Sequence, residues 1–331
     1  MTDPLLVADL SEAQLLSRIF PLLPQGPATI LGPGDDAAVV SAPDGRFVVS
    51  TDVLVEDHHF RRAWSTGYDV GWRAAMQNLA DCAAMGARTT SLVVALVIPG
   101  SLEVGWVTDL ARGLADACSR HGASVVGGDL SGGDRVVVAV TVHGDLEGRE
   151  PVLRSGARPG DVLAHAGVLG RSAAGLALLE AGRGAAAPGL VAGFLRPDPP
   201  LDAGVGAAAA GATAMLDVSD GLLRDAGRIA AASGVVIDLD DPALVLADDL
   251  AALQPACEAL GTEPLAWLLT GGEDHGMLAT FPAGAPLPPG FRPVGRVHGE
   301  RDGAVPSELV RVTVCGEAPT VHGGGWDHFA G

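Results

Sequence analysis

The stretch Gly32-Pro33-Gly34-Asp35-Asp36-Ala37-Ala38 places two adjacent carboxylates at a glycine-rich turn, directly before the apolar run that ends at Val40. Glycine lets the backbone turn sharply. An Asp at the edge of an apolar segment recurs in Ser50-Thr51-Asp52, Asn78-Leu79-Ala80-Asp81, Gly127-Gly128-Asp129 and Asp217-Val218-Ser219-Asp220. One such Asp is usually only a cap of a helix or turn. As a set, oxygen donors without matching His or Cys residues suit magnesium, so we expect a Mg-nucleotide site built from scattered aspartates.

The order of expected elements indicates an α/β fold. Residues 37–41 and 46–51 read as the two strands of a hairpin, and Asp69 is placed to cap a helix that ends at Gly86. A strand at 124–126 is expected to end at Gly127-Gly128-Asp129, and a strand at 212–216 to deliver Asp217 at its end. Ser219 or Asp220 is expected to cap the following helix.

The chain has 331 residues, which favours two domains. Between Gly144 and Pro159 it turns polar and rich in Gly and Pro. We therefore expect an N-terminal domain over 1–148 and a C-terminal domain over 149–331.

The charge pattern restricts the possible partners. A net charge of −19 argues against nucleic acid and anionic membranes, since both require basic surface. All 21 Lys+Arg residues are arginine, so neither a P-loop nor a protein-kinase fold can supply its lysine. No apolar run approaches the roughly 20 residues of a membrane span, no secretory signal is visible, and the four cysteines are widely spaced. These features favour a cytoplasmic protein with reduced thiols.

The stretch Gly167-Val168-Leu169-Gly170-Arg171-Ser172 is a glycine loop that opens an expected helix. Such a loop suits phosphate binding, but a plain strand-to-helix turn has the same pattern. Both interpretations stay open at this point.

The acidic motifs, taken in order, resemble those of the thiamine-monophosphate kinase family. Besides the five stretches above, the resemblance rests on His59-Phe60, Arg154-Ser155-Gly156-Ala157, Gly271-Gly272-Glu273-Asp274 and Trp326-Asp327-His328-Phe329. It spans nearly the whole chain. The sequence departs from the family pattern at Ala80 and Leu130, where a hydroxyl residue is more usual, and at His275-Gly276, where Tyr-Glu is expected.

The resemblance implies an N-terminal α/β domain with a mixed sheet that binds ATP and Mg²⁺ and dimerises, and a C-terminal α/β sandwich domain. It implies ATP-dependent phosphorylation of thiamine monophosphate to thiamine diphosphate, with several Mg²⁺ ions and ATP as co-substrate. The implied Mg²⁺ ligands are Asp36, Ser50, Thr51, Asp52, Asp81, Asp129, Asp217 and Asp220, with Asp35 as a second choice. The implied ATP contacts are Gly128, Asp129, Arg154 and Ser219, and the implied thiamine contacts are His59, Glu273 and Trp326.

The acceptor is itself an ionised phosphate, so we expect direct in-line transfer with no covalent nucleophile. Two other functions stay open. One is a different enzyme of the same superfamily, making an aminoimidazole ribonucleotide, selenophosphate or a carbamoyl-derived ligand. A selenophosphate-making enzyme should carry an N-terminal Cys or Sec and a Lys, and a carbamoyl-handling relative should end in Cys; this chain has neither feature. The second is a non-catalytic nucleotide or metal sensor.

Overall fold

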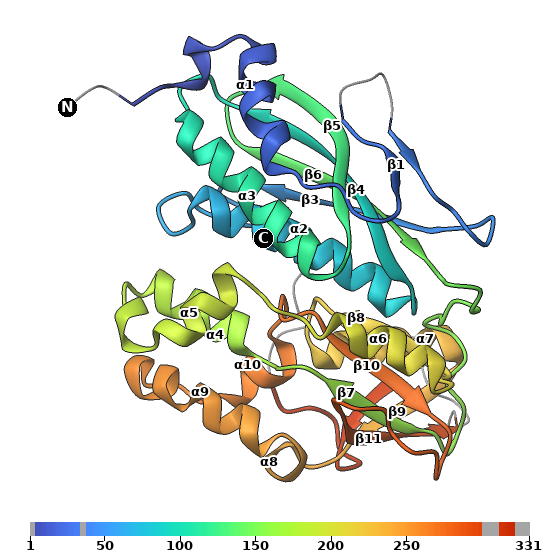
Figure 1. Ribbon diagram of the computed structural model, residues 1–331. Helices are drawn as coiled ribbons and strands as arrows, with labels where there is room; N and C mark the ends of the chain where they lie inside the picture. Colours follow the sequence, from blue (N-terminus) through green and yellow to red (C-terminus); the bar gives the residue numbers. More distant parts are fainter. Residues whose placement is uncertain (1–3, 34–37, 300–310, 322–331) are drawn as a thin grey trace. The chain divides into compact units, whose positions relative to one another are not determined.

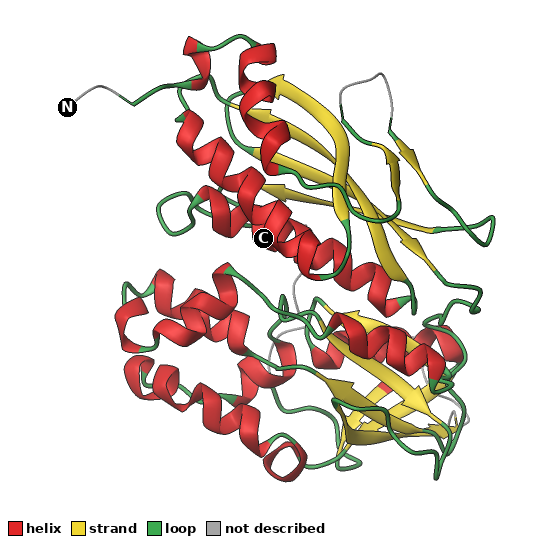
Figure 2. Ribbon diagram, in the orientation of Figure 1, coloured by secondary structure: helices red, strands yellow, loops and turns green. Residues whose placement is uncertain are grey.

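The computed structural model describes residues 4–33, 38–299 and 311–321 of the chain. The chain divides into two compact units (Figures 1 and 2). The first contains residues 1–82 and 87–148, and the second contains residues 83–86 and 149–331.

An N-terminal helical segment precedes the first sheet. It consists of the 3-10 helices η1 (Val7–Asp9) and η2 (Phe20–Leu22) and the helix α1 (Glu12–Ile19). Ser11 caps α1 by accepting a hydrogen bond from the Gln14 N–H, while the Gln14 side chain accepts from the Ser11 N–H. This reciprocal pair satisfies two donors that the helix itself leaves free.

The first unit is built on a mixed four-stranded sheet in the order β3-β6-β4-β5. Its strands are β3 (Val48–Val55), β4 (Arg88–Ile98), β5 (Ser124–Gly132) and β6 (Val137–Asp145). β4 and β5 are parallel, and the other neighbours are antiparallel. The helices α2 (Gly67–Ala84) and α3 (Val104–Arg120) cover one face (Figure 1), where Leu92, Val140 and Val142 are fully buried.

Helices do not cover the opposite face of this sheet in the same way. It carries Val49, Val53 and Val93, whose exposed fractions are 56%, 44% and 36%. The strand register places Ala139 between Val53 and Ala95 at the centre of this face. An exposed apolar surface of this kind on a sheet is unusual for a protein that acts alone.

The second unit contains a six-stranded sheet in the order β12-β9-β11-β7-β10-β8. The strands are β7 (Val162–Ala166), β8 (Ala214–Val218), β9 (Val235–Leu239), β10 (Gly276–Phe281), β11 (Phe291–Gly299) and β12 (Val312–Val314). All neighbours are antiparallel except β12 and β9.

Helices enclose this second sheet, in keeping with the expected α/β sandwich. They are α4 (Arg171–Glu180), η3 (Gly184–Ala186), α5 (Pro188–Leu195), α6 (Leu201–Ala209), α7 (Leu222–Ser233), α8 (Pro242–Val245), α9 (Ala247–Leu260) and α10 (Leu265–Thr270). The larger core joins Leu163, Leu216 and Leu278 of the sheet to residues of α4, α7 and α9. A smaller core packs Ala207 of α6 against Met215 and Phe281.

Several local predictions were wrong. The expected hairpin does not form, because β2 (Val39–Val40) pairs with β1 (Thr29–Leu31) and β3 pairs with β6. Thr66, and not Asp69, occupies the capping position of α2: the Asp69 N–H donates to the Thr66 hydroxyl, and the Thr66 N–H donates to the Asp69 carboxylate. Long-range strand pairing decides the first point, and no local pattern reports it.

Two strands also extend further than expected. β5 continues through Gly127-Gly128-Asp129, and β8 includes Asp217. Gly221 is the N-cap of α7, without a side-chain cap from Ser219 or Asp220. The acids of these motifs therefore lie within or beside strands, where neighbouring elements fix their direction.

Candidate active site

The first group of expected ligands joins β3 to α2. The Ser50 hydroxyl donates a 2.6 Å hydrogen bond to Oδ2 of Asp81, and Nε2 of Gln77 lies 3.3 Å from Oδ2 of Asp52. Successive side chains of a strand point to opposite faces, so Ser50 and Asp52 both face the helix that carries Asp81. This arrangement gathers hydroxyl and carboxylate oxygens, the donors that Mg²⁺ prefers.

Thr51 lies on the other face of the sheet. Its hydroxyl donates to the Val140 carbonyl at 2.9 Å and lies 3.2 Å from the hydroxyl of Thr141. The side chains of the three consecutive residues Ser50, Thr51 and Asp52 are therefore not brought together.

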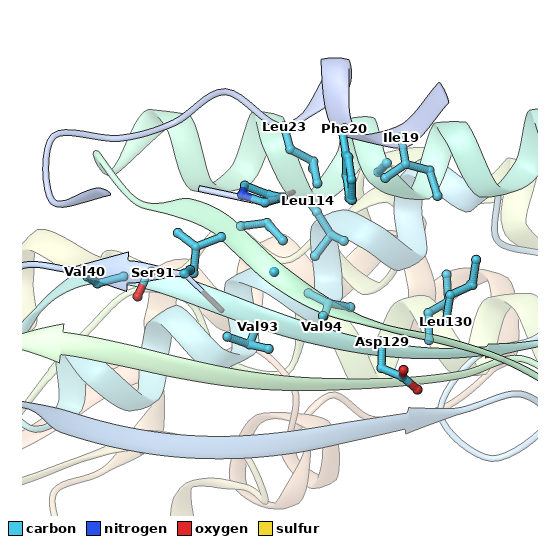
Figure 3. A pocket seen from close by; sticks show the side chains of 18 of the residues that line it. Ile19, Phe20, Leu23, Val40, Ser91, Val93, Val94, Leu114, Asp129 and Leu130 are labelled. Atoms are coloured by element: carbon cyan, nitrogen blue, oxygen red, sulfur yellow. The ribbon is translucent and has the colours of Figure 1, made fainter. Parts of the chain in front are cut away.

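Gly128 and Asp129 lie in β5 beside a cavity of about 670 Å³. A Cβ at Gly128 would lie 1.9 Å from the Val94 carbonyl oxygen, so only glycine permits the close pairing of β5 with β4. The Ser131 hydroxyl donates to Oδ2 of Asp129 at 3.0 Å. In Figure 3, Ile19, Phe20 and Leu23 border the cavity on one side, and Val93, Val94, Asp129 and Leu130 border it on the other.

The cavity is mainly apolar and has few polar groups in its wall. Its remaining lining includes Leu110, Ala111 and Leu114 of α3. The Ser91 hydroxyl, which also lines it, is fully buried and has no hydrogen-bond partner among the described residues. Ligand sites commonly combine an apolar wall of this volume with a few placed polar groups.

The backbone fixes the imidazole of His59. Nδ1 accepts a 3.0 Å hydrogen bond from the Val55 N–H. A neutral imidazole that accepts at Nδ1 carries its proton on Nε2, so His59 can donate from Nε2 to an acceptor.

In the second unit, Asp217 and Glu273 lie on either side of the His275 imidazole. Oδ2 of Asp217 is 2.9 Å from Nδ1 of His275, and Oε2 of Glu273 is 4.0 Å from Nε2. The Asp217 and His275 side chains are 7% and 5% exposed. A buried carboxylate needs hydrogen bonds or a nearby cation to offset its lost hydration.

Asp220 is held from two directions. Nη2 of Arg228 lies 2.6 Å from Oδ2 of Asp220, and the Asp220 N–H donates to the Asp225 carboxylate at 2.9 Å. Burial raises the pKa of Asp225 to about 7, while the Asp220 N–H and the Arg228 guanidinium act in the opposite direction. The motif is thus fixed by its own following helix.

Two other ATP contacts implied by the resemblance lie at opposite ends of α7, with Ser219 before its first residue and Arg154 beside its last residue, Ser233. The Ser219 carbonyl accepts a hydrogen bond from the Glu273 N–H. The Arg154 side chain is exposed, and its carbonyl accepts from the Ser233 hydroxyl.

Carboxylates already occupy the glycine loop at the start of α4. The Leu169 N–H donates to Asp249 at 3.1 Å, and the Ser172 N–H donates to Asp274 at 2.8 Å. Burial raises the pKa of Asp274 to about 7, against the N–H donors of Ser172 and Gly170. Of the two interpretations of this loop, the structure favours the strand-to-helix turn, because Asp249 and Asp274 already accept hydrogen bonds from it.

Some expected ligands cannot be placed. Asp35, Asp36 and Trp326 lie outside the described residues. Within the part of the chain that the structure describes, no group of three or more His, Cys, Asp or Glu side chains is arranged to hold a metal ion. Over the same residues, no helix has both the length and the apolar character of a membrane span.

The sequence did not single out Arg228, Asp225 or Ser91 as parts of a site. Asp225 and Arg228 are three residues apart on α7, and this spacing is the one local signal for their ion pair. Ser91 gives no local signal, since only the packing of the N-terminal segment creates the cavity beside it.

The fold and the acidic motifs together indicate the class of AIR synthase related proteins. The N-terminal and C-terminal domains of AIR synthase related proteins match residues 34–146 and 158–283. E. coli HypE, a hydrogenase maturation protein, shares the fold at 19% identity and a TM-score of 0.69, covering 92% of this chain and 95% of its own.

Closer relatives narrow the assignment. Thiamine-monophosphate kinase of Mycobacterium tuberculosis is 49% identical over 328 residues, covering 99% of this chain and 94% of its own length. The structure of AaThiL complexed with AMPPCP and TMP is 33% identical, with a TM-score of 0.76, and covers 89% of this chain and 91% of its own. This chain belongs to the thiamine-monophosphate kinase family.

Proposed function

We propose that this protein transfers the γ-phosphoryl group of ATP to thiamine monophosphate, forming thiamine diphosphate and ADP. The observation that carries the proposal is the match to a thiamine-monophosphate kinase over 99% of the chain. The AaThiL structure adds that a protein of this fold accommodates an ATP analogue and TMP. The chain is accordingly an enzyme, a phosphotransferase that uses a phosphate as acceptor.

The donor chemistry of the described residues fits Mg²⁺. Ser50, Asp52 and Asp81 present oxygen atoms from one face of β3 and from α2, and Asp217 is a buried carboxylate beside the half-buried Asp220. We assign these residues to metal binding, together with Asp129 and Asp36 from the resemblance. Thr51 is left out, because its hydroxyl lies on the other face of the sheet and donates to the Val140 carbonyl. Bound Mg²⁺ would neutralise the phosphates, whose mutual repulsion opposes the transfer.

Neighbouring side chains hold the carboxylates that we assign to the metal, and an exposed arginine is placed to bind a phosphate. Ser50 holds the Asp81 carboxylate, Gln77 holds Asp52, and Arg228 holds Asp220. Arg154, being exposed, is available for paired hydrogen bonds to a phosphate. The acceptor phosphate is ionised near neutral pH, so direct in-line transfer needs neither a strong base nor a covalent intermediate.

The cavity beside Gly128 and Asp129 suits the nucleoside part of ATP. Its volume of about 670 Å³ lies in the range of small-molecule sites, and its apolar wall suits a flat base. We assign the thiamine end of the acceptor to His59 and Glu273, and to Trp326 from the resemblance. His59 contributes an Nε2 donor, as its Nδ1 contact requires.

We also propose a homodimer in the cytoplasm. The apolar face that carries Val49 and Val53 supports association through the first sheet. The four free cysteines, three of them buried, support a reducing compartment.

The test is thiamine diphosphate formation by the purified full chain. With ATP, Mg²⁺ and thiamine monophosphate, we expect ADP and thiamine diphosphate in equal amounts, and no diphosphate when free thiamine replaces the monophosphate. Binding of ATP without ADP release would instead support a sensor and contradict the proposal.

A further inference from the structure

The His275 imidazole lies between two acidic groups that have separate roles in the proposed function. Its Nδ1 is 2.9 Å from Oδ2 of Asp217, and its Nε2 is 4.0 Å from Oε2 of Glu273. Asp217 is assigned to the metal and Glu273 to the thiamine end. With Asp217 ionised, the shorter contact is a hydrogen bond in which Nδ1–H donates.

The backbone that places His275 between the two acids is strained. Glu273 and His275 have φ angles of 70° and 54°, in the left-handed region that favours glycine. The N–H groups of Glu273 and His275 donate to the carbonyls of Ser219 and Val218, so this segment continues the pairing of β10 with β8. Strained non-glycine residues cluster at functional sites, where surrounding bonds enforce them.

Asp217 is a buried acid close to two other acids, Asp220 and Asp225, so it needs a hydrogen-bond donor of its own. Asp217 is 6% exposed. Asp217 and Asp220 both act to raise the pKa of Asp225, and Arg228 opposes them. Arg228 pairs with Asp220 and Asp225, whereas Asp217 bonds to the imidazole. The imidazole occupies Oδ2, which leaves Oδ1 as the oxygen for a cation.

We propose that His275 is a positioning residue that fixes the Asp217 carboxylate for a divalent cation and keeps it apart from the Glu273 carboxylate. The inference rests on the proposed function. A hydrogen bond to a ligating carboxylate sets its orientation, and removing such a partner typically lowers metal affinity or activity by about 10- to 100-fold.

Three variants of the full chain test this. His275→Ala removes the donor. His275→Asn keeps an N–H donor at the place of Nδ1, because both atoms are bonded to Cγ. His298→Ala, at an exposed position of β11, is the control for loss of a histidine.

The readouts separate positioning from mere packing. Binding of a non-hydrolysable ATP analogue is measured by calorimetry across a Mg²⁺ titration, and turnover is measured over the same range. For His275→Ala we expect the half-saturating Mg²⁺ concentration to rise about 10-fold or more, with turnover largely recovered at saturating Mg²⁺. His275→Asn should stay within about threefold of the wild type, and His298→Ala should match it.

Two results would overturn the proposal: an unchanged Mg²⁺ requirement in His275→Ala, or an equal defect in the Asn and Ala variants, which indicates packing alone. Thermal unfolding without Mg²⁺ checks the fold, and His275→Leu, which fills the site without a donor, replaces the Ala variant if that one does not fold. If the wild type makes no thiamine diphosphate but the Mg²⁺ shift in analogue binding appears, the proposed function fails and the role of His275 stands.

Discussion

At the scale of single residues, neighbours on other elements fix the carboxylates assigned to the metal. Ser50 holds Asp81 at 2.6 Å, and His275 holds Asp217 at 2.9 Å. Each partner donates its hydrogen bond to one oxygen of the carboxylate, Oδ2, and a carboxylate has a second oxygen with which to meet a cation. A pre-set orientation lowers the entropy lost when the cation binds.

Asp81→Asn should lower turnover at least about 100-fold, because it removes a ligand charge while keeping the shape of the side chain. The amide oxygen still accepts from Ser50, so we expect little change in thermal unfolding. Turnover is measured at several Mg²⁺ concentrations. Wild-type activity at limiting Mg²⁺ would contradict the assignment of Asp81.

Asp274 makes the stability of the protein depend on pH. Burial raises its pKa to about 7, whereas an unfolded Asp titrates near about 4. The protonated form of Asp274 is the one that burial favours. Its contribution to the free energy of unfolding is therefore complete below about pH 4 and is lost as the pH rises through about 7. Asp274→Asn keeps the acceptor for the Ser172 N–H but cannot ionise.

The difference in unfolding free energy between Asp274→Asn and the wild type should therefore shift in favour of the variant between pH 4.5 and 8. We expect a shift of about 1–3 kcal/mol from the size of the pKa change. Denaturant unfolding at several pH values measures it. A difference that is constant with pH would show that Asp274 does not titrate in this range.

At the scale of elements, glycines let α2 and α3 approach closely. A Cβ at Gly67 or Gly71 would lie 2.0 Å from the carbonyl oxygen of Trp106 or Leu110, and a Cβ at Gly113 would lie 2.2 Å from that of Tyr68. Small residues at such a contact bring the backbones together, and an added methyl group must push them apart. This contact supports the helix that carries Asp81.

Gly71→Ala should destabilise the protein by about 1–3 kcal/mol through overpacking. The matched control is Gly105→Ala in α3, where a Cβ would meet no atom within 4 Å; it should gain up to about 1 kcal/mol from helix propensity. Denaturant unfolding compares the two variants. Equal effects of both substitutions would contradict the close helix contact.

Elements with strong local signals were predicted well, and their pairings were not. The stop at Gly86, whose φ is 77°, is a local feature and formed as expected. The partner of β2 is β1, in the register that joins Thr29 to Val40, 11 residues apart. An alternating pattern predicts that a strand exists, but which strand it pairs with depends on how its apolar face is buried against the rest of the fold.

At the scale of the whole molecule, the uncovered face of the first sheet requires an explanation. Val49 and Val53 are exposed on β3. A second copy of the chain packed on this face would bury these side chains, in line with the proposed homodimer.

Val53→Arg should shift the protein towards the monomer in sedimentation velocity, because a charged side chain would replace an apolar one at the proposed interface. The control is Leu244→Arg, since Leu244 is 78% exposed in the second unit. A dimer that persists unchanged in Val53→Arg would place the interface elsewhere.

The sequence by itself determined the α/β class, the acidic motifs and their relation to thiamine-monophosphate kinases, because turns, caps and motif order are local properties of the chain. Tertiary structure alone decided that Ser50 and Thr51 face opposite sides of a sheet, that Asp249 and Asp274 occupy the glycine loop of α4, and that His275 meets Asp217. These contacts join residues that are far apart in sequence. Strand register and packing bring these residues together, and neither can be read from a single segment of the sequence.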